Sequence, residues 1–166
     1  MSTKTIGLVV ITISFSILFS YTSKAQTAMK TTEQQGMAAI FPKGDKAPSE
    51  YFTGTAWIKP LVPNDAMFNC QIGNVVFEPG ARNNWHTHAA GQILIATEGV
   101  GYYQEKGKSI QLLHKGDVVR IAPNVVHWHG ASPKSEFTHI AINPNTENGV
   151  VTWLQPVTDA EYNSFK

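Results

Sequence analysis

Two closely spaced histidines and an amide side chain lie in the segment Gly80-Ala-Arg-Asn-Asn-Trp-His86-Thr-His88-Ala-Ala-Gly-Gln92. In a β-strand, residues two apart point to the same side, so His86 and His88 project together. His127 and His129 repeat this spacing farther along the chain, and His139 follows them. If both pairs point inward, the imidazoles gather inside a β-barrel, where they suit a divalent metal ion.

The sequence around this stretch alternates short β-prone runs with turn signals, which is typical of an all-β sandwich or barrel. Glycines in Glu105-Lys-Gly-Lys108 and His114-Lys-Gly116 stand where tight reversals need a positive φ. Near the end, Thr158-Asp-Ala-Glu161 has the spacing of a capping box and predicts a short C-terminal helix over residues 158–165. The expected strands are residues 52–62, 71–78, 92–97, 109–113, 117–121, 137–143 and 150–154.

The N-terminus has the order of a secretory signal peptide: a positive start at Lys4, an apolar run over residues 6–20, and small residues at Ser23 and Ala25. We therefore expect a signal peptide over residues 1–25, a flexible N-terminal arm over 26–49 and one folded domain over 50–166. This division predicts an exported protein, periplasmic or secreted, with no membrane contact after cleavage. An uncleaved membrane anchor is the alternative, although the apolar run is short for a span of about 20 residues.

The composition excludes several classes of protein. The chain has 13 Lys and Arg against 12 Asp and Glu, so it lacks the basic footprint of a nucleic-acid-binding protein. A single cysteine, Cys70, excludes an intrachain disulfide and a cysteine-based zinc cage. The 166 residues suffice for one domain with a hydrophobic core and are too few for two domains of ordinary size.

Two motifs place the histidines in a known pattern. The first stretch matches Gly, five residues, His-x-His and three residues, with Gln92 where the pattern has Glu and with Gly99 after six more. The second, Gly116-Asp-Val-Val-Arg-Ile-Ala-Pro-Asn-Val-Val-His127, matches the pattern Gly, five residues, Pro-x-Gly-x-x-His. Ala122 stands in place of the Pro of this pattern, and Asn124 in place of its second Gly. The chain thus resembles the cupin superfamily from about Tyr51 onward.

The resemblance implies a small single-domain double-stranded β-helix, or jelly-roll barrel, that holds one divalent metal through His86, His88, Gln92 and His127. An amide in place of a carboxylate leaves the site more positive, which favours Lewis-acid chemistry over redox cycling. Imidazoles with an oxygen ligand accept Mn²⁺, Fe²⁺, Co²⁺, Ni²⁺ or Zn²⁺. By the same resemblance we expect a homodimer or a homotetramer.

A narrower resemblance comes from the segments Trp85-His-Thr-His88, His127-Trp-His-Gly-Ala131 and Thr138-His-Ile-Ala-Ile142, which are similar to bacterial cupin hydroxynitrile lyases and to carboxymuconolactone decarboxylase-associated cupins. This resemblance implies manganese as the metal, with His129 and His139 as catalytic proton shuttles. Asn143 shares a strand face with His139 and stands where these lyases carry Gln. The walls of the substrate pocket are expected from Val75, Phe77, Ile95, Trp128 and Asn143.

The expected function is a metal-dependent lyase that acts on a small hydroxy or carbonyl compound, such as a cyanohydrin. Two alternatives remain open: an iron-dependent dioxygenase, against which the neutral Gln92 counts, and a non-catalytic barrel that binds a small molecule. The pair His129 and His139 favours an enzyme, because simple capture of a molecule requires neither residue.

Overall fold

The computed structural model describes residues 39–65 and 67–166 of the 166-residue chain. The expected signal peptide, and the expected arm as far as residue 38, lie outside the described residues. Phe41–Lys166 is one compact unit, and its pairing begins before residue 50, because β1 (Asp45–Lys46) already pairs with β3 (Ala56–Val62). Within the described residues, no helix is long and apolar enough to cross a membrane.

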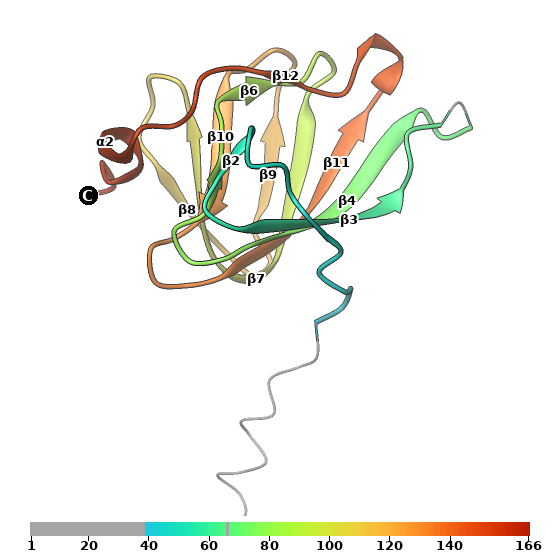
Figure 1. Cartoon of the computed structure of the whole chain (residues 1–166). Helices are drawn as coiled ribbons and strands as arrows, with labels where there is room; N and C mark the ends of the chain where they lie inside the picture. Colours follow the sequence, from blue (N-terminus) through green and yellow to red (C-terminus); the bar gives the residue numbers. More distant parts are fainter. Residues whose placement is uncertain (1–38, 66) are drawn as a thin grey trace, which may run out of the picture. The chain divides into compact units, whose positions relative to one another are not determined.

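Antiparallel strands make up most of this unit and curl into a small barrel (Figure 1). Besides β1 and β3, the strands are β2 (Phe52–Thr53), β4 (Cys70–Phe77), β5 (Arg82–Asn83), β6 (His86–Thr87), β7 (Gln92–Glu105), β8 (Gln111–His114), β9 (Val118–Ile121), β10 (His127–Ala131), β11 (Phe137–Pro144) and β12 (Thr152–Trp153). They follow the order β1-β3-β4-β11-β7-β10-β5-β2, with β8 and β9 paired to β7, and with β6 paired to β10 and β12. The fold is therefore all-β, as the sequence predicts.

The long strand β7, with 14 residues, belongs to both halves of the barrel. Its first half pairs with β11 and β9, and its second half pairs with β10 and β8. The halves meet at Gly99, where φ is +74° and an added Cβ would lie 1.8 Å from the carbonyl oxygen of Glu136. Only glycine fits this close crossing. The sequence prediction ended the strand at residue 97, because a glycine inside a strand pattern resembles a turn.

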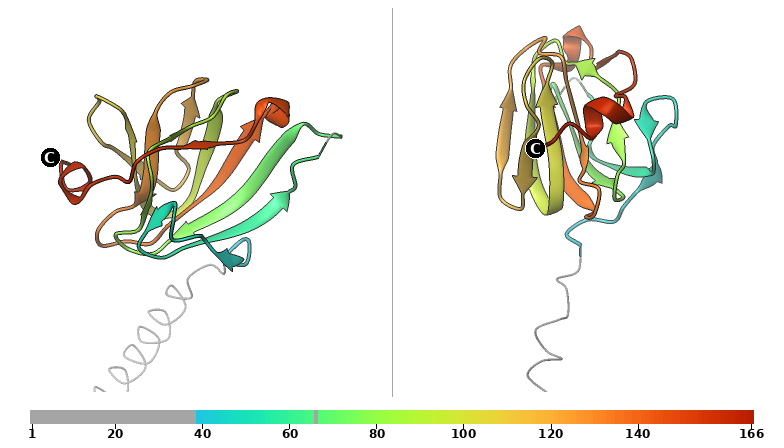
Figure 2. Two further views of the ribbon diagram at one scale, coloured as in Figure 1. Left: turned by 45° about the horizontal axis from the view of Figure 1, so that its top comes forward. Right: turned by 90° about the vertical axis from the view of Figure 1, so that its left-hand side faces the viewer.

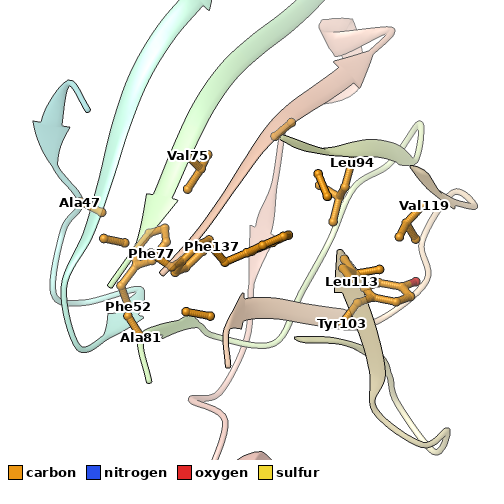
Figure 3. Close-up of a cluster of buried hydrophobic side chains, with 14 of the residues drawn as sticks. Ala47, Phe52, Val75, Phe77, Ala81, Leu94, Tyr103, Leu113, Val119 and Phe137 are labelled. Atoms are coloured by element: carbon orange, nitrogen blue, oxygen red, sulfur yellow. The ribbon is translucent and has the colours of Figure 1, made fainter. Parts of the chain in front are cut away.

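The main core consists of side chains from the inner faces of these strands. Figure 3 shows Phe52, Phe77 and Phe137 packed together on one side of this core, with Leu94 and Leu113 on the other. Phe77 and Phe137 have no exposed surface, and burying each side chain contributes roughly 1.5–3 kcal/mol. This apolar packing forms a rigid wall beside the histidines described below.

A second hydrophobic cluster packs beneath the C-terminal helix α2 (Asp159–Tyr162) and includes Trp85 and Trp128. Thr158 caps the helix in a capping box with Glu161, as its sequence predicts. The helix ends at Tyr162, three residues before the predicted end. Phe165 folds back instead and packs on Tyr102, with ring centroids 5.1 Å apart.

The segment before α2 crosses the barrel. After β11 the chain passes through a 3₁₀ turn at Thr146–Asn148 and through β12 to α2, which lies on the opposite side of the unit (Figure 2). Of the strand predicted over residues 150–154, only Thr152–Trp153 pairs, and its partner is β6. This pairing lays the C-terminal segment directly over the first histidine motif.

Apart from β7, the other predicted strands agree with the observed ones to within two residues at each end, except that Gly54 divides residues 52–62 into β2 and β3. The sequence missed β1, β5 and β6, because strands of two residues contain no alternation to detect. The expected strands also do not include β10, although the spacing of His127 and His129 suits a strand. All five residues of β10 are buried, so its sequence lacks the alternation of apolar and polar residues that marks a strand.

Candidate metal centre

The pairing of β6 with β10 brings the two histidine motifs together. His86 lies opposite His127 in the ladder, and their ring centroids are 4.2 Å apart. The ring of His88, which follows β6, lies 5.1 Å from that of His86 and 5.5 Å from that of His127. All three side chains are buried.

The turn of the second motif forms in spite of its two departures from the cupin pattern. Asn124 takes the left-handed conformation, with φ of 62°, in place of the pattern's glycine, and asparagine tolerates this conformation better than most residues do. Its N–H donates to the carbonyl oxygen of His88 at 2.9 Å. The turn therefore ties the second motif to the first.

Main-chain carbonyls hold the rings of these three histidines. Nδ1 of His86 lies 2.9 Å from the carbonyl oxygen of Asn84, and Nδ1 of His127 lies 2.9 Å from that of Val125. Nδ1 of His88 donates to the carbonyl oxygen of Val150. Because a carbonyl oxygen only accepts, each Nδ1 carries a proton, and Nε2 of each neutral ring keeps its lone pair.

Burial keeps the rings neutral at pH 7. It lowers the pKa of His127 to about 4 and also lowers the pKa of His88. Burial, together with repulsion from His127 and His88, holds the pKa of His86 well below its usual value. Nε2 of His88 is buried and has no hydrogen-bond partner within residues 39–65 and 67–166. An orphaned polar atom of this kind is costly unless something binds it.

Gln92 adds an oxygen to this group of nitrogens. Its Oε1 lies 3.3 Å from Nε2 of His127. Both atoms are acceptors, since the proton of His127 is on Nδ1, so no proton lies between them. Two buried acceptor atoms that face each other without a proton destabilise the fold. A cation bound to both atoms would remove this destabilisation. Imidazole nitrogens with a neutral oxygen are a donor set for a divalent transition metal, and these residues fit such an ion.

His129 belongs to the same cluster but has no carbonyl partner on its ring. One nitrogen from each of His86, His127 and His129 lies within 4.8 Å of the others, which is close enough for these three nitrogens to bind one divalent metal ion. Asn83 accepts from the backbone N–H of His129 at 3.0 Å, and its Nδ2 lies 3.1 Å from Nε2 and 3.3 Å from Nδ1 of the ring. Because an amide nitrogen only donates, Asn83 suits either neutral tautomer of His129.

His139 lies behind His129, with their ring centroids 4.8 Å apart. Its ring is stacked between Phe77 and Phe137, at centroid distances of 5.8 and 5.3 Å. The side chain is fully buried, and neither ring nitrogen has a hydrogen-bond partner among the described residues. Burial lowers its pKa to about 3. His139 is therefore a neutral imidazole at pH 7, and no hydrogen bond from the described residues fixes which of its two nitrogens carries the proton.

A cavity of about 230 Å³ opens onto these side chains. His86, His88, Gln92 and His129 line its polar part. Its other walls are mainly apolar and come from β2, β3, β4, β11 and the segment around β12, with Phe52, Ile58, Pro60, Ile72, Val151 and Trp153 among them. Such a cavity suits a small molecule with one polar end and one apolar end.

The predicted pocket residues divide into two groups. Val75 and Asn143 line the cavity. Phe77 does not, because its ring has no exposed surface and stacks on His139 instead. Ile95 does not either, because side chains alternate along a strand and the buried Leu94 and Ala96 take the inner face of β7. Trp128 lies in the second hydrophobic cluster on the outer side of β10.

Sequence reasoning missed three contributors to the site. The carbonyl of Val150 and the ring of Trp153, 4.9 Å from that of His86, come from the C-terminal segment, more than 60 residues away along the chain. No residue type signals that its main-chain carbonyl will hold a distant histidine. Asn83, in contrast, lies inside the first motif, where a buried amide on the strand before His86 was a usable signal.

Comparison with known proteins agrees with this geometry. The cupin domain family profile matches residues 73–142. An (R)-mandelonitrile lyase from Granulicella tundricola is 44% identical over 119 residues, 70% of this chain and 89% of that protein. A solved cupin-like protein from Thermotoga maritima is 54% identical with a TM-score of 0.73, over 75% of this chain and 94% of that one. A DMSP lyase from Ruegeria pomeroyi, at 13% identity, shares only the fold, with a TM-score of 0.54 over 82% of this chain and 70% of that one. With this relationship and a barrel that gathers both histidine motifs around one cavity, the chain belongs to the cupin family.

Proposed function

We propose that this protein is a manganese-dependent lyase that cleaves cyanohydrins or similar small hydroxy compounds. The observation that carries the proposal is a division among the buried histidines: three have a ring proton fixed by a main-chain carbonyl, and two do not. The 44% identity to an (R)-mandelonitrile lyase supports this class of reaction.

The proposed metal ligands are His86, His88, Gln92 and His127. In the three histidines the carbonyl partners leave Nε2 free to bind an ion, and this orientation is typical of metal-binding imidazoles. His129 lies in the same cluster, but its ring proton is not fixed, so we assign it a place beside the ion. When bound, the ion would act as a Lewis acid on a substrate oxygen.

His129 and His139 would move the proton. His129 lines the cavity, and burial followed by repulsion from His139 keeps its pKa well below the usual value, so the ring is neutral and can accept a proton. In the cleavage of a cyanohydrin, the hydroxyl proton passes to His129 and the oxygen forms a carbonyl group. Cyanide leaves with the bonding pair and takes up the proton. Before cyanide takes up the proton, His139, whose ring lies beside that of His129, would share it with His129.

The rest of the cavity would hold the substrate and exclude water. The apolar side chains of Ile58, Ile72 and Trp153 face the same space as the histidines and suit an aryl or alkyl substituent. If residues 1–25 act as a signal peptide, the reaction takes place in the periplasm or outside the cell.

The test is metal-dependent cyanide release by the full-length protein. Purified protein is freed of metal by chelation, reloaded with Mn²⁺ or Zn²⁺, and assayed for metal content and for cyanide release from racemic mandelonitrile. We expect release from the manganese form, none after chelation, and loss of both bound metal and release in His86→Ala. Stoichiometric manganese without cyanide release would contradict the lyase proposal, and absence of bound metal would contradict the metal centre as well.

A further inference from the structure

The side chain of Gln92 poses a problem of orientation. Its amide has an oxygen that can bind a cation and an NH₂ group that cannot, and the two ends have nearly the same shape. A rotation of the amide by 180° would replace the oxygen with two donors facing the imidazole nitrogens. A glutamate, the usual residue of the cupin pattern here, presents an oxygen in either orientation. The substitution by glutamine therefore requires a partner that distinguishes the two ends.

Asn143 occupies the place of such a partner. Nε2 of Gln92 donates to Oδ1 of Asn143 at 2.9 Å, while Oε1 of Gln92 is the atom that faces His127. Both amides are buried, with 5% and 8% of their surfaces exposed. The hydrogen bond is thus shielded from water, which would otherwise accept from either orientation of Gln92.

A third amide is hydrogen-bonded to Asn143 in turn. Asn143 lies opposite Gln71 in the ladder between β11 and β4, and its Nδ2 donates to Oε1 of Gln71 at 3.4 Å. With its NH₂ group directed at Gln71, Asn143 keeps its oxygen toward Gln92. Three amides from β4, β11 and β7 therefore form one chain of hydrogen bonds with a single direction.

We infer that Asn143 is a positioning residue that directs the carbonyl oxygen of Gln92, and not its NH₂ group, into the metal centre. The inference rests on the proposed function, because Gln92 must be a ligand for its orientation to matter. Asn143 also lines the cavity, so an effect on activity alone would not separate positioning from contact with substrate. The affinity for Mn²⁺ without substrate does separate them.

The experiment measures Mn²⁺ binding to the chelated full-length protein by the electron paramagnetic resonance signal of free Mn²⁺. Asn143→Leu removes both hydrogen bonds and keeps the same branched shape with the same number of heavy side-chain atoms, and we expect it to weaken binding by about 10–100-fold, the usual effect of losing a group that orients a ligand. Asn143→Asp keeps an acceptor for Gln92 and should restore wild-type or tighter binding. Asn74→Leu is the matched control, since Asn74, on β4, is a buried amide like Asn143 but lies outside the cavity, and its Nδ2 has no partner among the described residues.

A double-mutant cycle with Gln92→Ala tests whether Asn143 acts through Gln92. Once the amide at position 92 is gone, Asn143→Leu should cause no further loss of affinity. An equal loss in both backgrounds, or none in the wild-type background, overturns the inference. If Gln92→Ala itself leaves Mn²⁺ affinity unchanged, the proposed ligand set fails instead. Thermal melting of each metal-free variant verifies folding, and Asn143→Ala replaces Asn143→Leu if the latter does not fold.

Discussion

Two groups of histidines share the interior of one barrel and differ in how their rings are held. His86, His88 and His127 each donate Nδ1–H to a main-chain carbonyl. In the part of the chain that the structure describes, His139 has no partner on either nitrogen, and His129 is held by an amide that suits both of its tautomers. All five rings are buried and have a lowered pKa, so neither burial nor charge distinguishes the two groups.

Hydrogen bonding, and not the histidine itself, therefore selects the chemistry of each ring. A carbonyl on Nδ1 fixes one tautomer and directs a permanent lone pair to Nε2, which is what a metal ligand requires. A ring with no such partner can exchange its proton between the two nitrogens, which is what a proton carrier requires. One strand, β10, carries a member of each group, since His127 and His129 both belong to it.

The largest effect should come from replacing the unrestrained ring of His139. In the manganese-loaded protein, His139→Leu should lower the rate of cyanide release by about 10²–10⁴-fold, the usual contribution of general acid–base catalysis. Its metal content should equal that of the wild type, because His139 is not among the proposed ligands. Elemental analysis and the mandelonitrile assay on one sample measure both quantities. If the variant lost manganese together with activity, the distinction between metal-binding histidines and proton-carrying histidines would be contradicted.

The same variant should be as stable as the wild type or more stable. Leaving a buried polar atom unsatisfied costs about 1–3 kcal/mol, and His139→Leu removes two such nitrogens while it gives up the stacking on Phe77 and Phe137. We expect a net gain of about 1 kcal/mol in the free energy of unfolding, measured by urea denaturation of the chelated protein. A clear loss of stability would mean that the nitrogens of His139 have partners in solution.

Acid should destabilise the chelated protein through these buried rings. The unfolded histidines titrate near pH 6.5, whereas burial lowers the pKa of His127 to about 4 and that of His139 to about 3 in the folded protein. Between these values the unfolded chain binds more protons, so stability is complete above about pH 6.5 and falls as the pH decreases toward 4. Melting temperatures at pH 7, 6, 5 and 4 measure the decline. His139→Leu should show a shallower decline, and parallel curves for both proteins would contradict the role of His139.

Much of this site could be predicted from the spacing of residues along the chain. The period of two in His86-Thr-His88 and His127-Trp-His129 places side chains on a common strand face, and the two cupin motifs indicate which strands meet. Ile95, a predicted pocket residue, is not among the residues that line the cavity, and the same period of two, counted from Gln92, places it on the outer face of β7.

Contacts made by the main chain, or between segments far apart in sequence, could not be predicted in this way. The carbonyl of Val150 holds His88 because β12 pairs with β6, and the sequence of residues 150–154 gives no sign of that partner. The chain of amides from Gln71 to Gln92 likewise depends on the order β4-β11-β7. Register between strands is a property of the whole sheet, so a single sequence without a structure leaves it undetermined.

The smallest effect should come from His114, which is exposed and is the last residue of β8, just before the turn to β9. Its side chain is 63% exposed, and its Nδ1 lies 3.9 Å from a carboxylate oxygen of Asp117. The turn itself depends on the backbone N–H of His114, which donates to Asp117 at 2.7 Å and is present in any substitution except proline. His114→Gln should therefore change the free energy of unfolding by less than about 0.5 kcal/mol at pH 7 and at pH 5. Manganese content and cyanide release should equal those of the wild type. If His114→Gln made the decline of stability in acid as shallow as His139→Leu does, the acid lability would come from the surface of the protein, and the argument from buried rings would fail.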